Sequence, residues 1–192
     1  MYFEKPGPGN SEQAIEIAVR QGKERNISHI VISSNSGKTA ELLADEAKRA
    51  GYTGQLVCVT HAYGFRENGK NELADEDRRR LEERGVKVYT SSHILSGAER
   101  ALSRTYKGTY PVEIIAQSLK MLGQGTKVCV EISVMALDGG VIPFGTPVIA
   151  LGGTGGGVDT AVILSPAHGS NIFNTRIHEI LCKPWLGSSE GA

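Results

Sequence analysis

The sequence has no surplus of either charge, no long apolar run and no cysteine cluster. Its 192 residues include 21 basic and 21 acidic side chains, so no net field attracts nucleic acid or an anionic membrane. No run reaches the roughly 18 apolar residues of a membrane-spanning helix or forms a signal-peptide core. The three cysteines match no zinc or redox spacing: Cys58, Cys129 and Cys182. We therefore expect a soluble, cytoplasmic protein with reduced thiols, no metal site and no nucleic-acid or membrane partner.

The length and composition predict one compact α/β domain over residues 1–192. Hydrophobic residues make up 40% of the chain, and domains commonly run to roughly 100–200 residues. The polar end of the chain, GSSEGA, predicts a weakly ordered tail over about residues 186–192.

Helix and strand patterns alternate through the first half of the chain. Asn10 is expected to cap a helix that ends near Gly22. Buried strands and amphipathic helices follow in turn over residues 29–33, 37–50, 56–60, 75–84 and 86–90. This order predicts a three-layer α/β/α sandwich around a mostly parallel sheet, with right-handed crossovers.

The second half is less regular. Residues 111–122 predict a helix with proline in its first turn. Residues 126–138 are compatible with a strand, but the spacing of Val128, Ile132 and Met135 favours a buried helix. Two apolar runs, 148–151 and 160–164, predict a hairpin around a glycine-rich loop, and residues 177–181 predict an edge strand or a short helix.

The strand-to-helix loop SSNSGKT, residues 33–39, resembles an ATP-binding P-loop but lacks its first glycine, because Ile32 stands at that position. It nevertheless combines a glycine that allows close backbone approach with the unpaired amides of a helix start. Its hydroxyls come from Ser33, Ser34, Ser36 and Thr39 around Gly37. This predicts an anion site, with phosphate the favoured anion. The alternative is that Ser36 or a neighbour only caps the helix. Lys38 can add charge for the phosphate or point to water.

Two further loops leave the carboxyl ends of predicted strands, THAYGF at 60–65 and TSSHILSG at 90–97. Because ligands of parallel sheets bind at that edge, the three loops are expected to converge on one crevice. His93 and His168 are candidate proton donors or loop-bracing residues. Glu131 and Asp138 share a helix face and either approach the crevice or only pack.

The glycines at 152–157 do not form a G-x-G-x-x-G fingerprint, because Val158 stands where its last glycine would fall. A nicotinamide-binding Rossmann site is therefore not supported. This loop is either a flexible turn or a backbone surface that a flat ligand can approach.

Several segments together carry a family resemblance: HIVISSNSGKTAELLA, SHILSGAER, KVCVEISVMALDGGVIP, GGVDTAVILSPAHGSNIF and EILCKP. Over about residues 2–184 the chain resembles a stand-alone family related to the C-terminal α/β domain of pyruvate kinase, found in archaea and anaerobic bacteria. The similar loop of pyruvate kinase receives a phosphate of its sugar bisphosphate activator. The resemblance therefore implies a phosphate-binding set of Ser34, Ser36, Gly37 and Thr39, supported by Ser33.

Stand-alone relatives hold flavin mononucleotide (FMN), so the resemblance implies FMN with its phosphate on the 33–39 loop. The isoalloxazine is then expected to extend over Thr60, His61, Gly64 and Phe65, with Tyr63 or Phe65 stacking on it. Backbone amides of Gly152, Gly153 and Thr154 are expected at N5 or the pyrimidine edge. His61 and Phe65 can equally be loop residues without a ligand.

Two functions follow from these expectations. One is an FMN-dependent oxidoreductase of unknown substrate, and the other is a non-catalytic binding or regulatory module for a phosphorylated metabolite. Pyruvate kinase activity is not expected, because its (β/α)₈ barrel needs about 200 residues or more. The resemblance also implies a homo-oligomer, since pyruvate kinase domains of this kind pack against copies of themselves.

Overall fold

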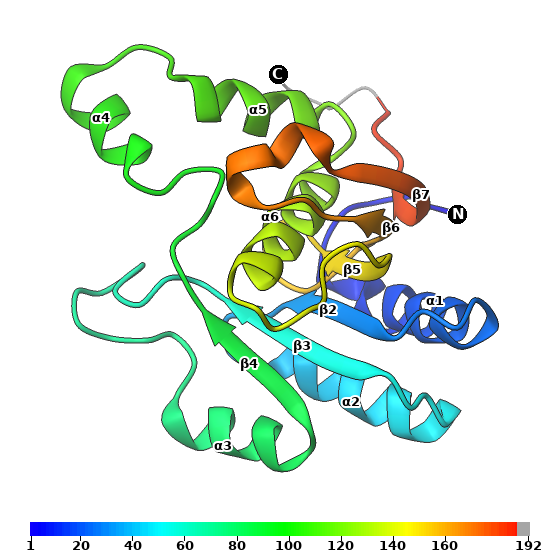
Figure 1. Ribbon diagram of the computed structural model, residues 1–192. Helices are drawn as coiled ribbons and strands as arrows, with labels where there is room; N and C mark the ends of the chain where they lie inside the picture. The colour runs from blue at the N-terminus through cyan, green and yellow to red at the C-terminus, as the bar shows by residue number, and fades with distance from the viewer. Residues whose placement is uncertain (188–192) are drawn as a thin grey trace.

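Residues 1–187 of the computed structural model are described here, and their strands form one seven-stranded mixed sheet (Figure 1). The strand order is β1-β7-β6-β5-β2-β3-β4. The strands are β1 (Tyr2–Phe3), β2 (His29–Ser33), β3 (Gln55–Thr60), β4 (Val86–Thr90), β5 (Val148–Gly152), β6 (Thr160–Ser165) and β7 (Arg176–Pro184). The α-helices are α1 (Ser11–Glu24), α2 (Lys38–Ala50), α3 (Asp75–Glu83), α4 (Glu99–Tyr106), α5 (Pro111–Lys120) and α6 (Gln124–Asp138). Short 3₁₀ turns lie at Pro8–Asn10 and Gly169–Asn174.

The sheet is parallel at its centre and on the β4 side, because β5, β2, β3 and β4 all run in one direction. β6 reverses this direction and pairs antiparallel with both β5 and β7, while β1 is parallel to β7. The carboxyl ends of β2, β3, β4 and β5 and the amino end of β6 therefore meet at one edge of the sheet. We call this the carboxyl edge.

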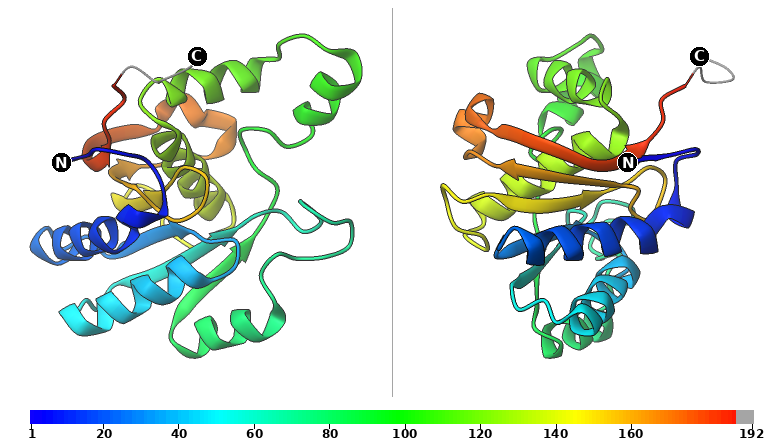
Figure 2. Two further views of the ribbon diagram at one scale, coloured as in Figure 1. Left: turned by 180° about the vertical axis from the view of Figure 1, so that it is seen from behind. Right: turned by 90° about the vertical axis from the view of Figure 1, so that its right-hand side faces the viewer.

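Helices cover both faces of the sheet and make three layers (Figure 2). Alternate residues of β2 pack on opposite faces of the sheet. Ile30 and Ile32 lie in the core beneath α1 and α2, whereas Val31 lies in the core beneath α6. This alternation follows from the two-residue period of a strand. The predicted α/β/α sandwich is confirmed.

The segment compatible with either a helix or a strand is a helix. In α6 almost every residue from Gly125 to Leu137 is buried, because one side packs on the sheet and α5 packs on another. A helix buried nearly all round has no polar face, which is why its β-branched residues also resembled a strand.

Three local predictions need correction. Asn10 does not cap α1: its Nδ2 donates to the Lys5 carbonyl oxygen at 2.8 Å, and α1 extends two residues past Gly22. β7 is a strand, but not an edge strand, because β1 lies beyond it. A further helix, α4, follows the TSSHILSG loop, and its connection to α5 projects from the sheet (Figure 1).

The predicted weak order of the tail over 186–192 falls mostly outside the described residues. Leu186 and Gly187 belong to no helix or strand, and residues 188–192 are not described. In residues 1–187 we found no helix with both the length and the apolar character needed to cross a membrane.

Candidate functional site

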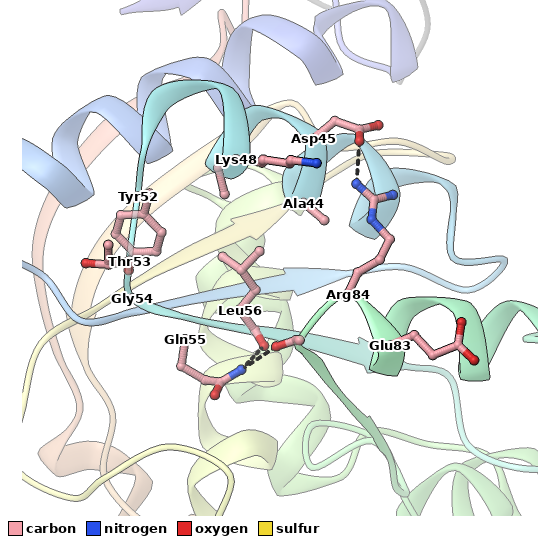
Figure 3. Close-up of a pocket in the computed structure, with 12 residues that line it drawn as sticks. Ala44, Asp45, Lys48, Tyr52, Thr53, Gly54, Gln55, Leu56, Glu83 and Arg84 are labelled. Carbon is pink, nitrogen blue, oxygen red and sulfur yellow. Dashed lines mark hydrogen bonds and ion pairs between the residues drawn. The ribbon is translucent and has the colours of Figure 1, made fainter.

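A large hollow lies at the amino ends of β3 and β4, opposite the carboxyl edge (Figure 3). Its volume is about 930 Å³. Several of its polar side chains already bind protein groups: Gln55 Nε2 donates to the carbonyl oxygens of Leu56 and Gly85, both at 2.9 Å, and Arg84 pairs with Asp45. The Tyr52 hydroxyl donates to the Ile27 carbonyl at 2.8 Å. We call this hollow the amino-edge groove.

A second cavity of about 590 Å³ opens at the carboxyl edge, and we call it the carboxyl-edge cavity. Loops from distant parts of the chain meet there because their strands end at the same edge. Its lining consists of Pro8, Ser11, Ser33, Ser34, Asn35, Ser36, Lys38, Thr39, Val59, Thr60, His61, Arg66, His93, Gln124, Val128, Glu131, Ile132, Met135, Gly153, Gly155, Gly156 and Gly157. All three loops expected to converge supply residues to it.

The reversal of β6 brings the glycine-rich loop to the same cavity. Since β5 ends and β6 begins at the carboxyl edge, the loop between them, 153–157, curls over that edge. Gly157 at its end is packed tightly: an added Cβ would lie 2.5 Å from Pro8 Cα and 2.6 Å from Ser11 Oγ. The loop is therefore anchored against the start of α1 and is not a free turn over its whole length.

The 33–39 loop leads into α2 without a side-chain cap. Gly37 occupies the N-cap position with φ 85°, and no side chain bonds to the first turn. Among residues 1–187, the amides of Lys38, Thr39 and Ala40 have no hydrogen-bond acceptor, whereas the Glu41 amide donates to Gly37. Free amides at the positive end of a helix dipole form an anion site. The alternative in which Ser36 caps the helix is therefore not what the structure shows.

The hydroxyls of this loop divide into two pairs. Thr39 Oγ1 donates to the Ser33 carbonyl at 3.0 Å, and Ser33 Oγ donates to the Leu151 carbonyl at 3.3 Å, so both protons are committed to the protein. Ser34 and Ser36 have no side-chain partner among the described residues. Ser34 is 6% exposed, yet no fully buried side-chain polar atom there is unpaired, so its hydroxyl opens into the cavity.

Gly37 has a structural role rather than a ligand contact. Its positive φ is a conformation that favours glycine, and an added Cβ would lie 3.0 Å from Leu73 Cδ1, on the α3 side of the loop. It does not line the cavity. Its left-handed conformation turns the chain into α2, whose first three amides have no acceptor among residues 1–187.

Thr60 fixes the backbone at the start of the next loop. Arg78 donates to Thr90 Oγ1 at 2.7 Å, the hydroxyls of Thr90 and Thr60 lie 2.6 Å apart, and Thr60 Oγ1 donates to the His61 carbonyl at 3.0 Å. Because arginine only donates, these bonds run in one direction, from Arg78 through Thr90 and Thr60 to His61. Thr60 lines the cavity, but its proton is already used.

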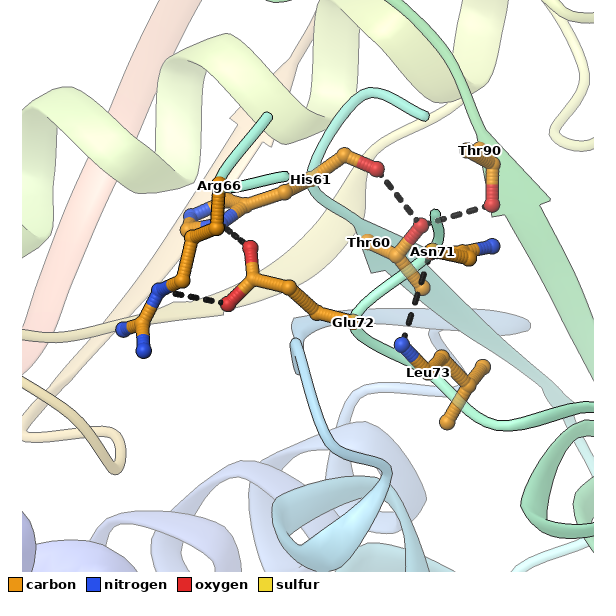
Figure 4. A network of polar contacts seen from close by, with 7 residues as sticks. All are labelled: Thr60, His61, Arg66, Asn71, Glu72, Leu73 and Thr90. Carbon is orange, nitrogen blue, oxygen red and sulfur yellow. Dashed lines mark hydrogen bonds and ion pairs between the residues drawn. The ribbon is translucent and has the colours of Figure 1, made fainter. Parts of the chain in front are cut away.

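His61 is held by an acidic partner. Its Nδ1 lies 2.5 Å from Glu72 Oε2, and the other carboxylate oxygen of Glu72 forms an ion pair with Arg66 Nε at 2.9 Å (Figure 4). Since a carboxylate accepts, the hydrogen is on His61 Nδ1. No residue in 1–187 bonds to Nε2, so this atom is the available nitrogen of a cavity-lining ring.

Two further rings, those of Phe65 and His93, lie beside the His61 ring. Phe65 does not line the cavity, but its ring centroid lies 4.1 Å from that of His61 and 5.0 Å from that of His93. The two histidine rings are 5.1 Å apart. Burial lowers the pKa of His93, and the nearby His61, Lys127 and Arg100 lower it further while Glu131 opposes them. His93 therefore favours the neutral form.

Other predicted residues lie away from the cavity, namely Gly64, Gly152 and Thr154. An added Cβ on Gly152 would lie 2.5 Å from the Gly125 carbonyl oxygen, so Gly152 allows α6 to approach β5. Gly64 donates from its amide to Lys70 within its own loop. Tyr63 is also outside the lining, 66% exposed, and donates to the Gly69 carbonyl. Of the predicted glycine-loop residues, only Gly153 faces the cavity.

The acidic candidates on α6 have different surroundings. Glu131 lines the cavity, is 3% exposed, pairs with Lys127 and accepts from the Leu95 amide at 3.2 Å. Asp138 pairs with His168 Nδ1 at 2.8 Å, outside the lining. His168 therefore braces a loop.

Sequence reasoning missed several lining residues, among them Ser11, Arg66 and Gln124. Ser11 and Gln124 lie at the starts of α1 and α6, and only the tertiary fold brings those starts to the cavity. Arg66 lies in a predicted loop, where its charge was a usable signal. In residues 1–187, no group of three or more His, Cys, Asp or Glu side chains is placed to hold a metal.

The fold is that of an α/β protein with a cavity at the carboxyl edge of its mixed sheet. Residues 12–164 match the family model described as pyruvate kinase, alpha/beta domain, and the chain belongs to this family.

Solved structures similar to this chain include three of pyruvate kinase from Cryptosporidium parvum, one of them in complex with ADP. They share 16–18% identity with it, at TM-scores of 0.35, 0.35 and 0.39. The matches cover 76%, 90% and 83% of this chain, but only 21%, 23% and 24% of those chains. This chain therefore spans about a quarter or less of the proteins that it matches there.

Proposed function

We propose that the carboxyl-edge cavity binds a phosphorylated small molecule, with FMN as the favoured ligand. The observation that carries this proposal is the uncapped start of α2, where three amides and the hydroxyls of Ser34 and Ser36 have no partner among residues 1–187. A phosphate accepts several hydrogen bonds at once, and its charge suits a helix N-terminus. Lys38 lines the same cavity and supplies a cation beside it.

The rest of the cavity suits a flat ring system. Val128, Ile132 and Met135 of α6 form an apolar wall, and the backbone of the 153–157 loop lies across the edge from the loop that would hold the phosphate. The volume of about 590 Å³ falls within the range of small-molecule sites. FMN carries both groups, a terminal phosphate and a planar ring, on one molecule.

Bound FMN would supply electron-transfer chemistry. We therefore propose a flavin-dependent oxidoreductase of unknown substrate, and the alternative is a module that binds a phosphorylated metabolite without reaction. A cytoplasmic location and self-association remain predictions. We expect no pyruvate kinase turnover from these residues, whose strands form one open sheet instead of a barrel.

The test is FMN binding by wild type and by Ser36→Asp, followed through the visible absorption of the purified protein and the quenching of added FMN fluorescence. A carboxylate about 4 Å from a phosphate costs about 4 kcal/mol at an effective dielectric of about 20. The affinity should therefore fall at least about 100-fold. Ser36 is exposed, so the variant should fold.

Thr53→Asp is the matched control. It places the same carboxylate at an exposed position of the amino-edge groove, where screening should keep FMN affinity within about twofold of wild type. Wild type that neither carries nor takes up FMN would overturn the flavin proposal. Retained FMN binding by Ser36→Asp would overturn the assignment of the phosphate to the 33–39 loop.

A further inference from the structure

The loop after β3 contains a charged arrangement that phosphate binding does not explain. Glu72 lies between His61 and Arg66, with one carboxylate oxygen toward each, and the three side chains point toward one another (Figure 4). Glu72 is largely buried, with 17% of its side chain exposed, and His61 has 27% exposed. A loop that only had to cover the sheet would not need a carboxylate directed at a histidine from eleven residues away.

We infer that His61 is a proton-transfer residue of the carboxyl-edge cavity and that Glu72 positions it. Nε2 of His61 then takes up or releases a proton at the ring system of the ligand whose phosphate lies on the 33–39 loop. This inference rests on the proposed function for the identity of the ligand. It adds the residue that exchanges a proton with that ligand.

The arrangement meets the requirements of such a residue. The Glu72 carboxylate fixes the tautomer with hydrogen on Nδ1, which leaves Nε2 with a lone pair when the ring is neutral and a second proton when it is charged. Proton exchange at Nε2 therefore needs no rotation of the ring.

Two further contacts hold the ring in place. The carbonyl of His61 is bonded by Thr60, at the end of the chain of donors that begins at Arg78. On the side-chain level, Phe65 packs against His61, and the Arg100 guanidinium lies 5.6 Å from the centroid of the Phe65 ring. Backbone and side chain are thus both fixed, as proton transfer by a positioned side chain requires.

His93 is the other histidine of the cavity and a less suitable proton carrier. It has no carboxylate partner at hydrogen-bond distance in residues 1–187, and burial keeps it neutral. The titratable and charged groups around the two rings are Glu72 and Arg66 from the same loop, His93 and Arg100 from the segment after β4, Lys127 and Glu131 from α6, and Lys38 from α2.

The experiment is long-range ¹H–¹⁵N NMR of the histidine rings at one mildly alkaline pH, without ligand and then with FMN. In wild type, neutral His61 should carry its hydrogen on Nδ1. In Glu72→Gln, part of the hydrogen should move to Nε2, because an amide can donate as well as accept and so no longer fixes the tautomer.

Glu67→Gln is the matched control, since Glu67 lies in the same loop but pairs with Lys70 and is 65% exposed on its side chain. It should leave the His61 tautomer unchanged. A His61 hydrogen on Nε2 in wild type, or equal tautomer populations in Glu72→Gln and Glu67→Gln, would overturn the positioning by Glu72. The tautomer is read in wild type, so this arm stands even if a variant fails to fold.

The ligand arm separates this inference from the proposed function. Added FMN should shift the His61 Nε2 resonance and leave that of His178, whose ring binds Ser165 outside the cavity, in place. FMN that quenches its fluorescence on binding but leaves Nε2 unshifted would overturn the proton-transfer role alone. Absence of FMN binding would overturn the proposed function and, with it, this role, whatever the tautomer.

Discussion

The two ends of helix α2 differ in the hydrogen bonding of their backbone groups, and each end lies beside one of the two hollows. At its C-terminal end, beside the amino-edge groove, three of the last four carbonyls accept hydrogen bonds: Gly51 donates to Lys48, Tyr52 donates to Ala47, and Lys23 Nζ donates to Ala50. At its N-terminal end, beside the carboxyl-edge cavity, three amides have no acceptor in residues 1–187. The terminal backbone groups of α2 are thus mostly hydrogen-bonded at its C-terminal end and unpaired within residues 1–187 at its N-terminal end.

This difference shows why volume is a poor guide to a binding site. The amino-edge groove is the larger hollow, but its glutamine, arginine and tyrosine already bind protein groups. A ligand there would have to replace those bonds. In the smaller cavity a ligand would satisfy donors that are otherwise left to water, and such unpaired groups favour binding.

The largest effect is expected from two glycines, one in each region. Gly157→Ala and Gly85→Ala both introduce a side chain at positive φ, 67° and 79°, which costs each about 1–2 kcal/mol. Only at Gly157 does the new Cβ also meet Pro8, whereas nothing lies within 4 Å at Gly85. Gly157→Ala should therefore lower the free energy of unfolding by about 1–3 kcal/mol more than Gly85→Ala does, because the new methyl group also overpacks the site.

Urea unfolding of the two variants and wild type measures this difference. Equal losses would mean that the glycine-rich loop does not pack against the start of α1 in solution. The rim of the carboxyl-edge cavity would then not be anchored to the rest of the protein.

A smaller effect is expected from two lysines at the two ends of α2. Lys38→Met removes a cation from the carboxyl-edge cavity, and Lys48→Met removes one from the amino-edge groove. An exposed ion pair contributes up to about 1 kcal/mol, so FMN affinity should fall up to about fivefold in Lys38→Met only.

Fluorescence titration measures both affinities, and salt provides a second check. At about 1 M ionic strength, where the Debye length is about 3 Å, most of the difference between the variants should disappear. Equal affinities at low salt would instead place the Lys38 ammonium in water, which is the second of the two roles that the sequence allows.

The smallest effects concern pH, and the two regions should respond at opposite ends of the scale. Burial lowers the pKa of His93, so below about pH 6.5 the unfolded chain takes up a proton that the folded protein resists. Stability is then lost as the pH falls from about 6.5 toward the lowered value. Burial raises the pKa of Tyr52 to about 12. Unfolded tyrosine ionises near pH 10, so stability is lost as the pH rises between these two values.

The free energy of unfolding of wild type, His93→Asn and Tyr52→Phe against pH separates the two contributions. His93→Asn should flatten the acid side only, and Tyr52→Phe the alkaline side only. His29, whose pKa burial also lowers, is present in all three proteins, so differences between curves isolate the substituted residue. His93→Asn that flattens the alkaline side of the curve, or Tyr52→Phe that flattens the acid side, would contradict the assignment of each pH range to its residue.

The central fold was predictable because its signals are local. The apolar run of β2, the helical spacing of α2 and the left-handed Gly51 that ends it all appear within about twenty residues of sequence. β1 was not predictable: two residues hold no periodicity, and its pairing with Lys183 and Pro184 comes from the other end of the chain. The same pairing is why β7 is not at the edge.

The site was predictable as far as it depends on strand ends. The residues 33–39 and the position of His61 follow from where β2 and β3 end, since parallel strands share one edge. What the sequence could not show is which polar groups bind each other. Thr39 and Ser33 look as available as Ser34 and Ser36, and only tertiary contacts to Ser33 O and Leu151 O distinguish them. The sequence also could not show what each glycine packs against: Gly152 lies against α6, and Gly157 lies against the start of α1.

Because β6 runs antiparallel to β5, the two strands are joined by a hairpin loop whose length can change during evolution. The residues that flank the glycine-rich loop are pinned, Gly152 opposite Thr160 in the ladder and Gly157 against Pro8. Residues 154–156 between them carry no sheet pairing, so their number can change without shifting the register of any strand. The hairpin is therefore a place where insertions and deletions can reshape the rim of the cavity while the layers of helix and sheet beneath it stay unchanged.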